Sequence, residues 1–427
     1  MKFKSLCVLG LGYIGLPTAS TFATHGLQVT GVDVDRRVID VLRNGEVHIQ
    51  EPGLRTLVQA AFGSGKLSIE QAPAAADAFI IAVPTPITAE KRADLSYVRA
   101  AAESIKPVLR PGNLVVLEST SPPRTTIDLV APILEGSGLH AGTDFYLAYS
   151  PERVLPGKIL QELIENARVI GGIDEASARA GRDLYASFVR GDILLTDATT
   201  AEMVKLMENT YRDVNIAIAN EFSRLGHAFG VDIWQAIELA NLHPRVKILR
   251  PGPGVGGHCI SVDPWFLVEA APEISALIRQ ARMVNDGQPA VVVDLVREAL
   301  GPLKGKRICA LGLSYKADVD DLRESPALEV VELLAKAGVK VVTYEPFVPM
   351  ANVSGSSAAA TLGDALLDAE AILLLVDHSQ FKQLDPVWLA DQTQARTVID
   401  TRGVWSSSAW NEAGFRMYTL GAGGSNA

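Results

Sequence analysis

The chain has 427 residues, of which 48% are hydrophobic and 21% charged, a composition typical of a globular protein with two or three domains. Its net charge of −10 and isoelectric point of about 5.3 argue against a nucleic-acid-binding protein, because such proteins normally present a basic face. The N-terminus lacks a signal-peptide pattern, no apolar run could span a bilayer, and the three cysteines form no disulfide framework. We therefore expect a cytoplasmic protein with reduced thiols and no membrane or nucleic-acid partner.

The chain starts with a short apolar strand that ends in a glycine-rich turn. In "CVLGLGYIGLPTA", Gly10, Gly12 and Gly15 lie between that strand and a helical pattern, and a second strand, "QVTGVD", ends in Asp33. Strand, glycines, helix and acid in this order form a dinucleotide fingerprint, in which glycines let the backbone approach the pyrophosphate and the acid binds the ribose. We predict NAD rather than NADP, because a 2′-phosphate would meet the charge of Asp33, although two arginines follow it. The alternative is a glycine turn without a ligand.

A weak internal repeat relates the two ends of the chain. The segment "KSLCVLGLGY" aligns with "KRICALGLSY", which begins at Lys306, and later apolar strands echo each other similarly. Apolar strands that alternate with helical patterns indicate parallel sheets covered by helices on both faces. The predicted fold is therefore α/β, with two Rossmann-like doubly wound parallel-sheet domains joined by a central helical domain. The expected boundaries are 1–198, 199–301 and 302–427.

The middle of the chain is predicted to be helical. Thr199 and Glu202 have the spacing of a capping box, and apolar residues between 204 and 218 repeat every three or four positions, which predicts one buried helix face. A second long helix is expected from about residue 272 to residue 300. The final "GAGGSNA" is expected to form a flexible tail.

Three polar residues on the first of these helices share one stripe. Lys205, Asn209 and Arg212 lie at i, i+4 and i+7. The stripe can be a solvated surface on which Glu208 and Arg212 form an ion pair. Alternatively, a nearly buried lysine and asparagine can stabilise a developing oxyanion by charge and hydrogen bonding.

One cysteine differs from the other two, which lie in the repeated first strands as small core residues. Cys259 follows the loop "PGPGVGGH". It can be a buried structural thiol, a zinc ligand together with His243, His258 and Asp263, or a nucleophile whose thiolate is favoured by nearby cations. The preceding "HPRVKILRPG" contains only basic charges, so it is either a solvated loop or a clamp for a phosphorylated substrate.

A nicotinamide site together with a nucleophilic thiol suggests a particular reaction. One hydride leaves an alcohol to give an aldehyde, and the thiolate adds to this aldehyde to form a thiohemiacetal. A second hydride leaves to give a thioester, and water releases a carboxylate. An enzyme that only interconverts an alcohol and a carbonyl needs no such thiol.

At this point the residues match a known family. The stretches "GLGYIGLPTA", "ESTSPP", "SPERVLPGK", "AEMVKLMENTYRDVNIAIANE", "HPRVKILRPGPGVGGHCISVDPWFL" and "GLSYKADVDDLRESPA" resemble the UDP-glucose/GDP-mannose dehydrogenases, over nearly the whole chain. Within that family they resemble most closely the branch that oxidises UDP-N-acetyl-D-mannosamine. The resemblance implies an N-terminal NAD domain, a central helical domain that forms a homodimer, and a C-terminal domain that binds UDP.

The resemblance also implies roles for particular residues. Cys259 would carry the thioester, Lys205 and Asn209 would stabilise oxyanions, and Asp263 would orient or activate water. Thr120 and Glu152 would lie near the reacting carbon, with Glu152 as a candidate base. The cofactor-binding positions are Gly10, Gly12, Tyr13, Ile14, Gly15, Asp33, Arg37, Thr85 and Arg323. The substrate-contacting positions are Arg153, Val154, Arg212, His243, Arg245, Gly256, Tyr315, Lys316 and Arg402.

Departures from the family pattern bear on the substrate. The UDP-glucose branch usually has GGSC followed by a Lys-Asp pair, whereas here His258 precedes the cysteine and Val262 precedes Asp263. Arg124 stands where relatives often have glycine. We therefore expect NAD-dependent oxidation of UDP-N-acetyl-D-mannosamine to its uronate. The alternatives are UDP-N-acetylglucosamine or UDP-glucose as substrate and, in another class, a non-catalytic nucleotide-sugar or NAD sensor.

Overall fold

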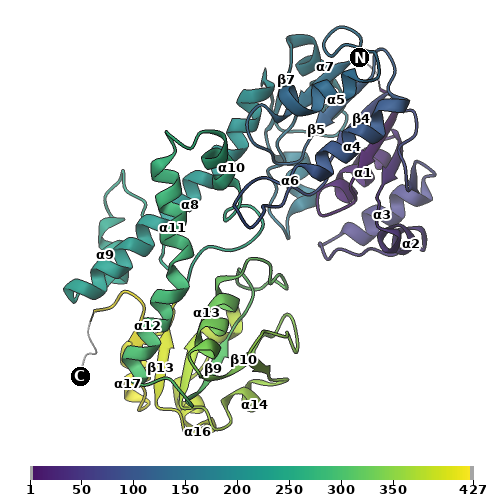
Figure 1. Cartoon of the computed structure of the whole chain (residues 1–427). Coiled ribbons are helices and arrows are strands. Elements are labelled where there is room, and N and C mark those ends of the chain that lie inside the picture. Colours follow the sequence, from purple (N-terminus) through teal and green to yellow (C-terminus); the bar gives the residue numbers. More distant parts are fainter. Residues whose placement is uncertain (1–2, 424–427) are drawn as a thin grey trace. The chain divides into compact units, whose positions relative to one another are not determined.

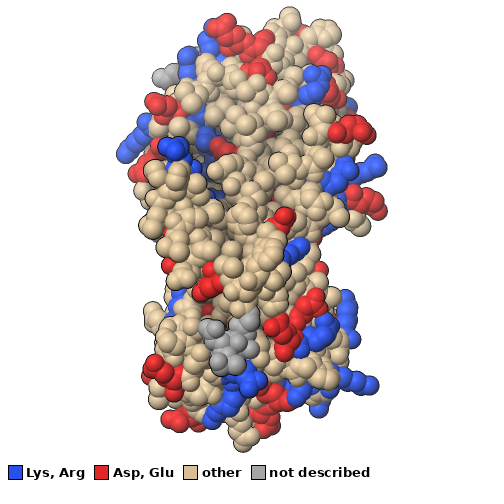
Figure 2. Space-filling model, turned by 90° about the vertical axis from the view of Figure 1, so that its left-hand side faces the viewer, with Lys and Arg blue, Asp and Glu red and all other residues tan. Residues whose placement is uncertain are grey.

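A computed structural model describes residues 3–423, and the chain divides into two compact units. The first unit comprises Met1–Glu208 and Trp265–Pro272, and the second comprises Asn209–Pro264 and Glu273–Ala427. Among the described residues, no helix combines the length and the apolar character needed to cross a membrane. On the face drawn in Figure 2, basic and acidic side chains are interspersed, so that face carries no continuous basic area.

The first unit is built on an eight-stranded sheet with the order β3-β2-β1-β4-β5-β6-β7-β8. Its strands are β1 Ser5–Leu9, β2 Gln28–Val32, β3 Leu67–Glu70, β4 Ala78–Ile81, β5 Leu114–Leu117, β6 Tyr146–Tyr149, β7 Arg168–Gly172 and β8 Ile193–Asp197. Its longer helices are α1 Gly15–Thr24, α2 Arg36–Arg43, α3 Leu54–Gly63, α4 Ser96–Ile105, α5 Ala131–Glu135, α6 Ile159–Glu165 and α7 Glu175–Tyr185. Neighbouring strands are parallel except β6 and β7, which pair in antiparallel fashion.

The second unit contains a six-stranded, wholly parallel sheet with the order β11-β10-β9-β12-β13-β14. Its strands are β9 Arg307–Leu311, β10 Lys340–Tyr344, β11 Ser356–Ala358, β12 Ala371–Leu374, β13 Thr397–Asp400 and β14 Arg416–Thr419. The helices around it are α13 Pro326–Lys336, α14 Leu362–Leu366, α15 Ser379–Lys382, α16 Pro386–Gln392 and α17 Ser407–Glu412. In the sequence between β8 and β9, the chain forms α8 Ala198–Phe229, α9 Ile233–Ala240, α10 Asp263–Ala270, α11 Ala276–Asp286 and α12 Gln288–Leu300 (Figure 1).

Each sheet separates two hydrophobic cores, as expected when helices cover both faces. Along β1, Leu6 and Val8 enter one core and Cys7 enters the other. Along β9, the repeat places Cys309 in the equivalent position. Burial raises the pKa of both thiols to about 12, so they stay protonated at neutral pH and serve as core residues. The predicted doubly wound fold with a central helical region is confirmed.

Three local predictions in the helical region are wrong. Asp197, which directly precedes α8, accepts the amide hydrogen of Thr200 at 2.9 Å, so Glu202 is not part of a capping box. The second long helix is divided at Gly287 into α11 and α12. Residues 421–423 are not a free tail, because the amide of Ile233 donates to the carbonyl of Gly421 at 3.1 Å. The rest of that tail, residues 424–427, lies outside the described part of the chain.

The apolar face predicted for α8 is not buried within one chain. Met207, Tyr211 and Ile218 are 58%, 72% and 44% exposed. Helical spacing identified an apolar stripe, but spacing does not reveal whether a partner in the same chain covers it.

Glu202 on α8 holds the loop that contains Arg124. The buried Glu202 carboxylate accepts the amide hydrogen of Arg124 at 2.5 Å and that of Thr126 at 2.8 Å, which ties α8 to the loop after β5. This loop requires a positive φ of 74° at Arg124, the conformation that favours glycine. Arg124 adopts this conformation, and its guanidinium pairs with Asp128 at 2.7 Å.

We predict that Arg124→Gly is more stable to unfolding than Arg124→Ala by about 1 kcal/mol. Both variants lose the ion pair with Asp128, but only glycine relieves the left-handed backbone. Urea unfolding followed by circular dichroism measures the difference. Equal stabilities would mean that the backbone at this position stores no strain.

Candidate active site

The glycine turn after β1 has the geometry of a dinucleotide-binding turn. A Cβ on Gly10 would lie 2.6 Å from the carbonyl oxygen of Ala82, and one on Gly15 would lie 1.7 Å from the carbonyl oxygen of Gly10. A Cβ on Gly12 would meet nothing within 4 Å, so its open side is free for a ligand. The first glycine therefore allows the turn, the third lets α1 pack on β1, and the second leaves space for a pyrophosphate. These residues fit NAD.

Asp33 fixes this turn from the end of β2. One carboxylate oxygen accepts the amide of Leu11 and the other that of Asp35, each at 2.9 Å. Each oxygen keeps a second lone pair, which a ribose hydroxyl can use. The other predicted cofactor positions in this unit lie around the same turn or on nearby loops: Tyr13 follows Gly12, Ile14 begins α1, and Thr85 follows β4. Arg37 is exposed and pairs with Asp35 at 2.9 Å.

The second sheet repeats this arrangement, but the environment of its acid differs. Gly312 has a φ of 88°, close to the 89° of Gly10, and Glu345 at the end of β10 accepts the amides of Leu313 and Phe347 at 2.7 and 2.9 Å. Glu345 is buried, however, and Nε2 of the fully buried His378 lies 3.1 Å from its carboxylate. The acid of the second sheet is therefore buried against a histidine, whereas Asp33 of the first sheet is only half-buried.

Two predicted catalytic residues follow neighbouring strands of the first sheet. Thr120 comes after β5 and Glu152 after β6, and the ends of adjacent parallel strands meet at one edge. The Glu152 carboxylate accepts the amide of Arg153 at 2.7 Å and the guanidinium of Arg168 at 2.9 Å. Glu152 is therefore held in one orientation within this edge.

Lys205 is half-buried on α8, within the first unit. One turn further, Glu208 pairs with Arg153 at 2.7 Å, so the ion pair that the sequence suggested between Glu208 and Arg212 is replaced by a link to the loop after β6. Arg212 is exposed. Val154, next to Arg153, packs against the core of the first unit.

Cys259 is exposed in the turn that leads into α10. Its carbonyl accepts the amide of Asp263 at 2.8 Å, which places the buried Asp263 one turn after the thiol. The side-chain amide of Asn209 donates to Asp263 at 2.6 Å. The second unit thus brings three of the predicted catalytic residues into one connected arrangement.

The loop before Cys259 packs on the loop after β9. A Cβ on Gly257 would lie 2.8 Å from the ring of Tyr315, and one on Gly256 would lie 2.3 Å from the carbonyl of Glu324. His258 has its Nε2 3.4 Å from Asp321, which also holds Arg323 at 2.7 Å. Burial would raise the pKa of Asp321, but its hydrogen bonds to Arg323 and His258 hold that pKa well below the usual range. The predicted cofactor residue Arg323 thus belongs to the second unit, apart from the others in the division of the chain.

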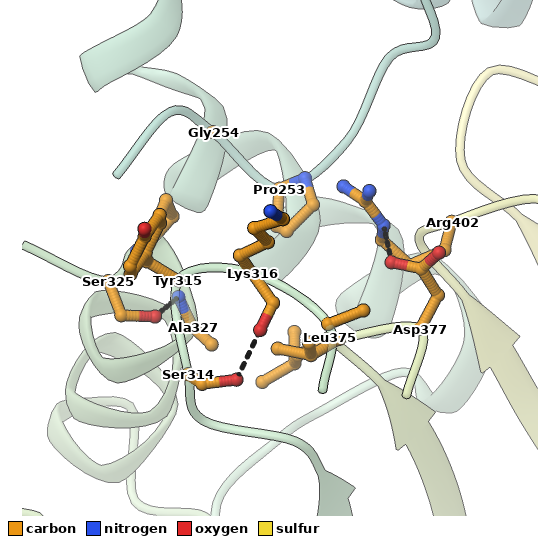
Figure 3. A pocket seen from close by; sticks show the side chains of 13 residues that line it. Pro253, Gly254, Ser314, Tyr315, Lys316, Ser325, Ala327, Leu375, Asp377 and Arg402 are labelled. Atoms are coloured by element: carbon orange, nitrogen blue, oxygen red, sulfur yellow. Dashed lines mark hydrogen bonds and ion pairs between the residues drawn. The ribbon is translucent and has the colours of Figure 1, made fainter. Parts of the chain in front are cut away.

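A cavity of about 290 Å³ lies beside this loop, within the second unit. Figure 3 shows Tyr315, Lys316 and Arg402 around it, together with the start of α13. Two cations, an aromatic ring and a helix N-terminus form a setting suited to a nucleotide diphosphate. All three residues were predicted to contact the substrate.

Two acids that the sequence analysis missed shape this cavity. Asp377 accepts a hydrogen bond from Arg402 at 3.0 Å, and burial, which would raise its pKa, is outweighed by the charges of Arg402 and Lys382. Asp400 is fully buried and accepts four backbone amides from residues 402–405. Its position at the end of an apolar strand, directly before "TRG", is the feature of the sequence that could have identified it.

The basic loop after α9 is exposed at His243 and Arg245. Within it, the amide of Arg245 donates to Nδ1 of His243 at 3.4 Å, and Arg250 lies 4.0 Å from Glu238. In the part of the chain that the structure describes, no three His, Cys, Asp or Glu side chains gather as a metal site requires, so the zinc interpretation of Cys259 has no supporting geometry.

We predict that Asp33→Ala lowers the affinity for NAD at least about tenfold, because a charged acceptor for the ribose is lost. The affinity for UDP should stay unchanged, since its predicted cavity belongs to the other unit. Isothermal titration calorimetry with each ligand measures both. An equal loss of both affinities would show that the turn after β1 is not the NAD site.

Comparisons with known proteins agree with this geometry over the whole chain. Residues 4–189 match the NAD binding domain of the UDP-glucose/GDP-mannose dehydrogenase family, residues 199–287 match its central domain, and residues 309–407 match its UDP binding domain.

Similar proteins cover nearly the same length. An NDP-N-acetyl-D-galactosaminuronic acid dehydrogenase from Ralstonia nicotianae is 49% identical, over 95% of this chain and 97% of that protein. A UDP-N-acetyl-D-mannosamine dehydrogenase from Methanococcus maripaludis is 47% identical, over 98% and 97%. The solved structure of the UDP-D-ManNAc dehydrogenase from Pyrococcus horikoshii superposes with a TM-score of 0.91 at 43% identity, over 98% of this chain and 99% of that one. The chain therefore belongs to the UDP-glucose/GDP-mannose dehydrogenase family, with an NAD binding domain first and a UDP binding domain last.

Proposed function

We propose that this enzyme oxidises the primary alcohol of UDP-N-acetyl-D-mannosamine to the carboxylate, in two steps on one site. The observation that carries the proposal is the arrangement around Cys259: an exposed thiol, with a buried Asp263 one turn later that Asn209 holds at 2.6 Å. An enzyme that stopped at the aldehyde would need neither group.

The chain's residues can support each step of this reaction. NAD, held by the glycine turn after β1 and by Asp33, would supply the hydride acceptor for each of the two oxidations. The Cys259 thiolate forms a C–S bond to the aldehyde carbon, whose oxygen becomes a thiohemiacetal alkoxide. Loss of the second hydride turns this adduct into a thioester. Water then attacks the thioester carbon, the C–S bond breaks, and the thiolate and a carboxylate are released.

Lys205 and Asn209 are suited to stabilise the oxygen charge that develops in these adducts. They lie four residues apart on α8 and therefore on the same side of the helix. Asn209 donates one amide hydrogen to Asp263, and its second hydrogen stays available for a substrate oxygen. Asp263, buried and oriented by that bond, is suited to accept a proton from the attacking water.

The identity of the sugar is proposed from the similar proteins. Relatives named as UDP-N-acetyl-D-mannosamine dehydrogenases are 43–47% identical over nearly the full length. A second candidate is an N-acetylgalactosamine-type nucleotide sugar, because the Ralstonia nicotianae relative with that activity in its name is 49% identical. Both sugars carry an acetamido group, so the proposal commits to a 2-acetamido sugar and names the mannosamine first.

We further propose a homodimer formed through α8. Tyr211, Ile218, Leu225 and Phe229 are exposed by 72%, 44%, 43% and 76%. The first three are seven residues apart, so they lie along one stripe of a long helix. A second copy of the same helix would bury this stripe, and the exposed basic loop at His243 and Arg245 would be available to the partner's substrate.

We place the enzyme in the cytoplasm, because the proposed chemistry requires a reduced thiol. Cys259 is exposed and would be open to oxidation in an oxidising compartment.

The wild-type enzyme should form two NADH for each UDP-N-acetyl-D-mannosamine consumed, and Cys259→Ser should form no carboxylate while it still binds NAD and UDP. The serine hydroxyl is a far weaker nucleophile at neutral pH. Absorbance at 340 nm with product analysis measures this, with the galacto sugar, UDP-N-acetylglucosamine and UDP-glucose run in parallel.

One NADH per sugar would mean that the reaction stops at the aldehyde. Binding of the sugar without any NADH would favour a sensor. Wild-type turnover in the serine variant would rule out covalent catalysis at Cys259, and preference for another sugar would keep the mechanism but replace the substrate.

We predict that Ile218→Lys converts the dimer to a monomer, because a charge in the centre of the stripe cannot be buried without a partner. Analytical ultracentrifugation measures the mass. Leu367→Lys is the matched control, since Leu367 is 63% exposed but lies beside α14. A wild-type chain that sediments as a monomer, or dissociation by the control, would contradict the assignment of this stripe.

A further inference from the structure

A buried guanidinium lies beneath the two loops that carry Thr120 and Glu152. Arg168, the first residue of β7, is only 6% exposed. Its guanidinium donates to Glu152 at 2.9 Å, to the hydroxyl of Ser150 at 3.0 Å and to Glu118 at 3.3 Å. The ring of Tyr185 on α7 lies below it, 4.4 Å from the guanidinium carbon, and the tyrosine hydroxyl donates to Glu118.

The two carboxylates belong to two different loops of the same sheet edge. Glu118 directly follows β5 and lies two residues before Thr120, whereas Ser150 directly follows β6 and Glu152 comes two residues later. Arg168 therefore connects the ends of β5 and β6 through one rigid, planar group. An arginine suits this role because its fork can bind two acceptors at fixed angles, which a lysine cannot.

We propose that Arg168 is the positioning residue of the first unit: it fixes the orientation of the Glu152 carboxylate and holds the Thr120 loop against it. The inference rests on the proposed dehydrogenase function, in which both loops face the reacting carbon. Arg168 itself touches no substrate. It acts through Glu152, whose other oxygen accepts the amide of Arg153 at 2.7 Å, so that carboxylate has a donor on each oxygen.

The charges around Arg168 do not balance within the cluster. Two carboxylates share one guanidinium, and the group faces Glu118 from β5, Glu152 from β6 and Tyr185 from α7. Burial raises the pKa of Glu118 to about 7, although Arg168 lowers it. Arg168 is therefore the cation to which both loop carboxylates are bound.

The test compares Arg168→Gln with Arg168→Lys and with the wild-type enzyme. We expect the glutamine variant to lose kcat by about 100-fold, because the two loops are no longer fixed to each other. The affinity for NAD should stay within about threefold, since the turn after β1 is intact. Arg168→Lys should recover part of kcat, because it keeps the charge but not the fork.

A pH profile separates a positioning role from a structural one. Removing the positive charge disfavours the ionised form of carboxyl groups beside it, so the acid limb of kcat should move to higher pH in Arg168→Gln. The matched control is Arg282→Gln, which removes another buried arginine, paired with Asp213 at 2.6 Å in the second unit. This control should lower the melting temperature and leave the acid limb in place.

A double-mutant cycle then tests whether Arg168 acts through Glu152. Added to Glu152→Gln, the Arg168→Gln change should cost little further kcat, because the group that it positions is already gone. Independent, multiplicative losses, or an Arg168→Gln enzyme with wild-type kcat and pH profile, would overturn the proposal.

A second variant and an assay of the wild-type enzyme allow the outcome to be interpreted. If Arg168→Gln does not fold, the double variant Glu118→Gln/Arg168→Gln removes one carboxylate with the cation and still breaks the contact to Glu152, so its kcat, pH profile and cycle with Glu152→Gln decide in the same way. NADH production by the wild-type enzyme tests the proposed function separately. A wild-type enzyme without NADH production refutes that function, whereas an active wild type with an unaffected Arg168 variant refutes only this inference.

Discussion

A carboxylate at the end of the second strand of each sheet holds the turn on which ligand binding depends. In the first sheet Asp33 accepts the amide of Leu11, and in the second Glu345 accepts that of Leu313. Both turns begin with a glycine of positive φ. In both sheets, a carboxylate that accepts amide hydrogens of the turn therefore fixes the conformation of that turn. The difference between them is local: Asp33 is only half-buried, whereas Glu345 faces the buried His378.

This difference accounts for a repeated fold with two ligands. A half-buried acid with spare lone pairs can receive a ribose, so the first sheet suits a dinucleotide. Glu345 is buried and already faces a histidine, and the second sheet offers Lys316 and Arg402 beside a cavity. The two sheets thus divide the work of binding cofactor and substrate, and duplication of one architecture can supply both sites.

Buried charge in the first unit and exposed apolar surface on α8 have opposite consequences. Arg168 and Glu202 are buried with partners from distant segments, which makes their loops costly to move. Apolar side chains such as Tyr211 and Phe229 remain exposed in a single chain, which leaves stability to be gained from a second copy. The first feature favours a rigid site and the second favours an oligomer.

Local spacing in the sequence was enough for the glycine turns, the core strands with Cys7 and Cys309, and the position of Cys259 after a glycine-rich loop, because each depends on neighbouring residues. It failed for Glu202, whose carboxylate binds amides almost 80 residues away rather than its own helix terminus. It also passed over Arg168, since a lone arginine at the start of an apolar strand has no periodic signal. Residue types and short spacings thus determined the family, the cofactor type and the candidate nucleophile. Only the tertiary structure decided which buried charges meet and which apolar faces stay open, because those contacts join segments that the chain order keeps far apart.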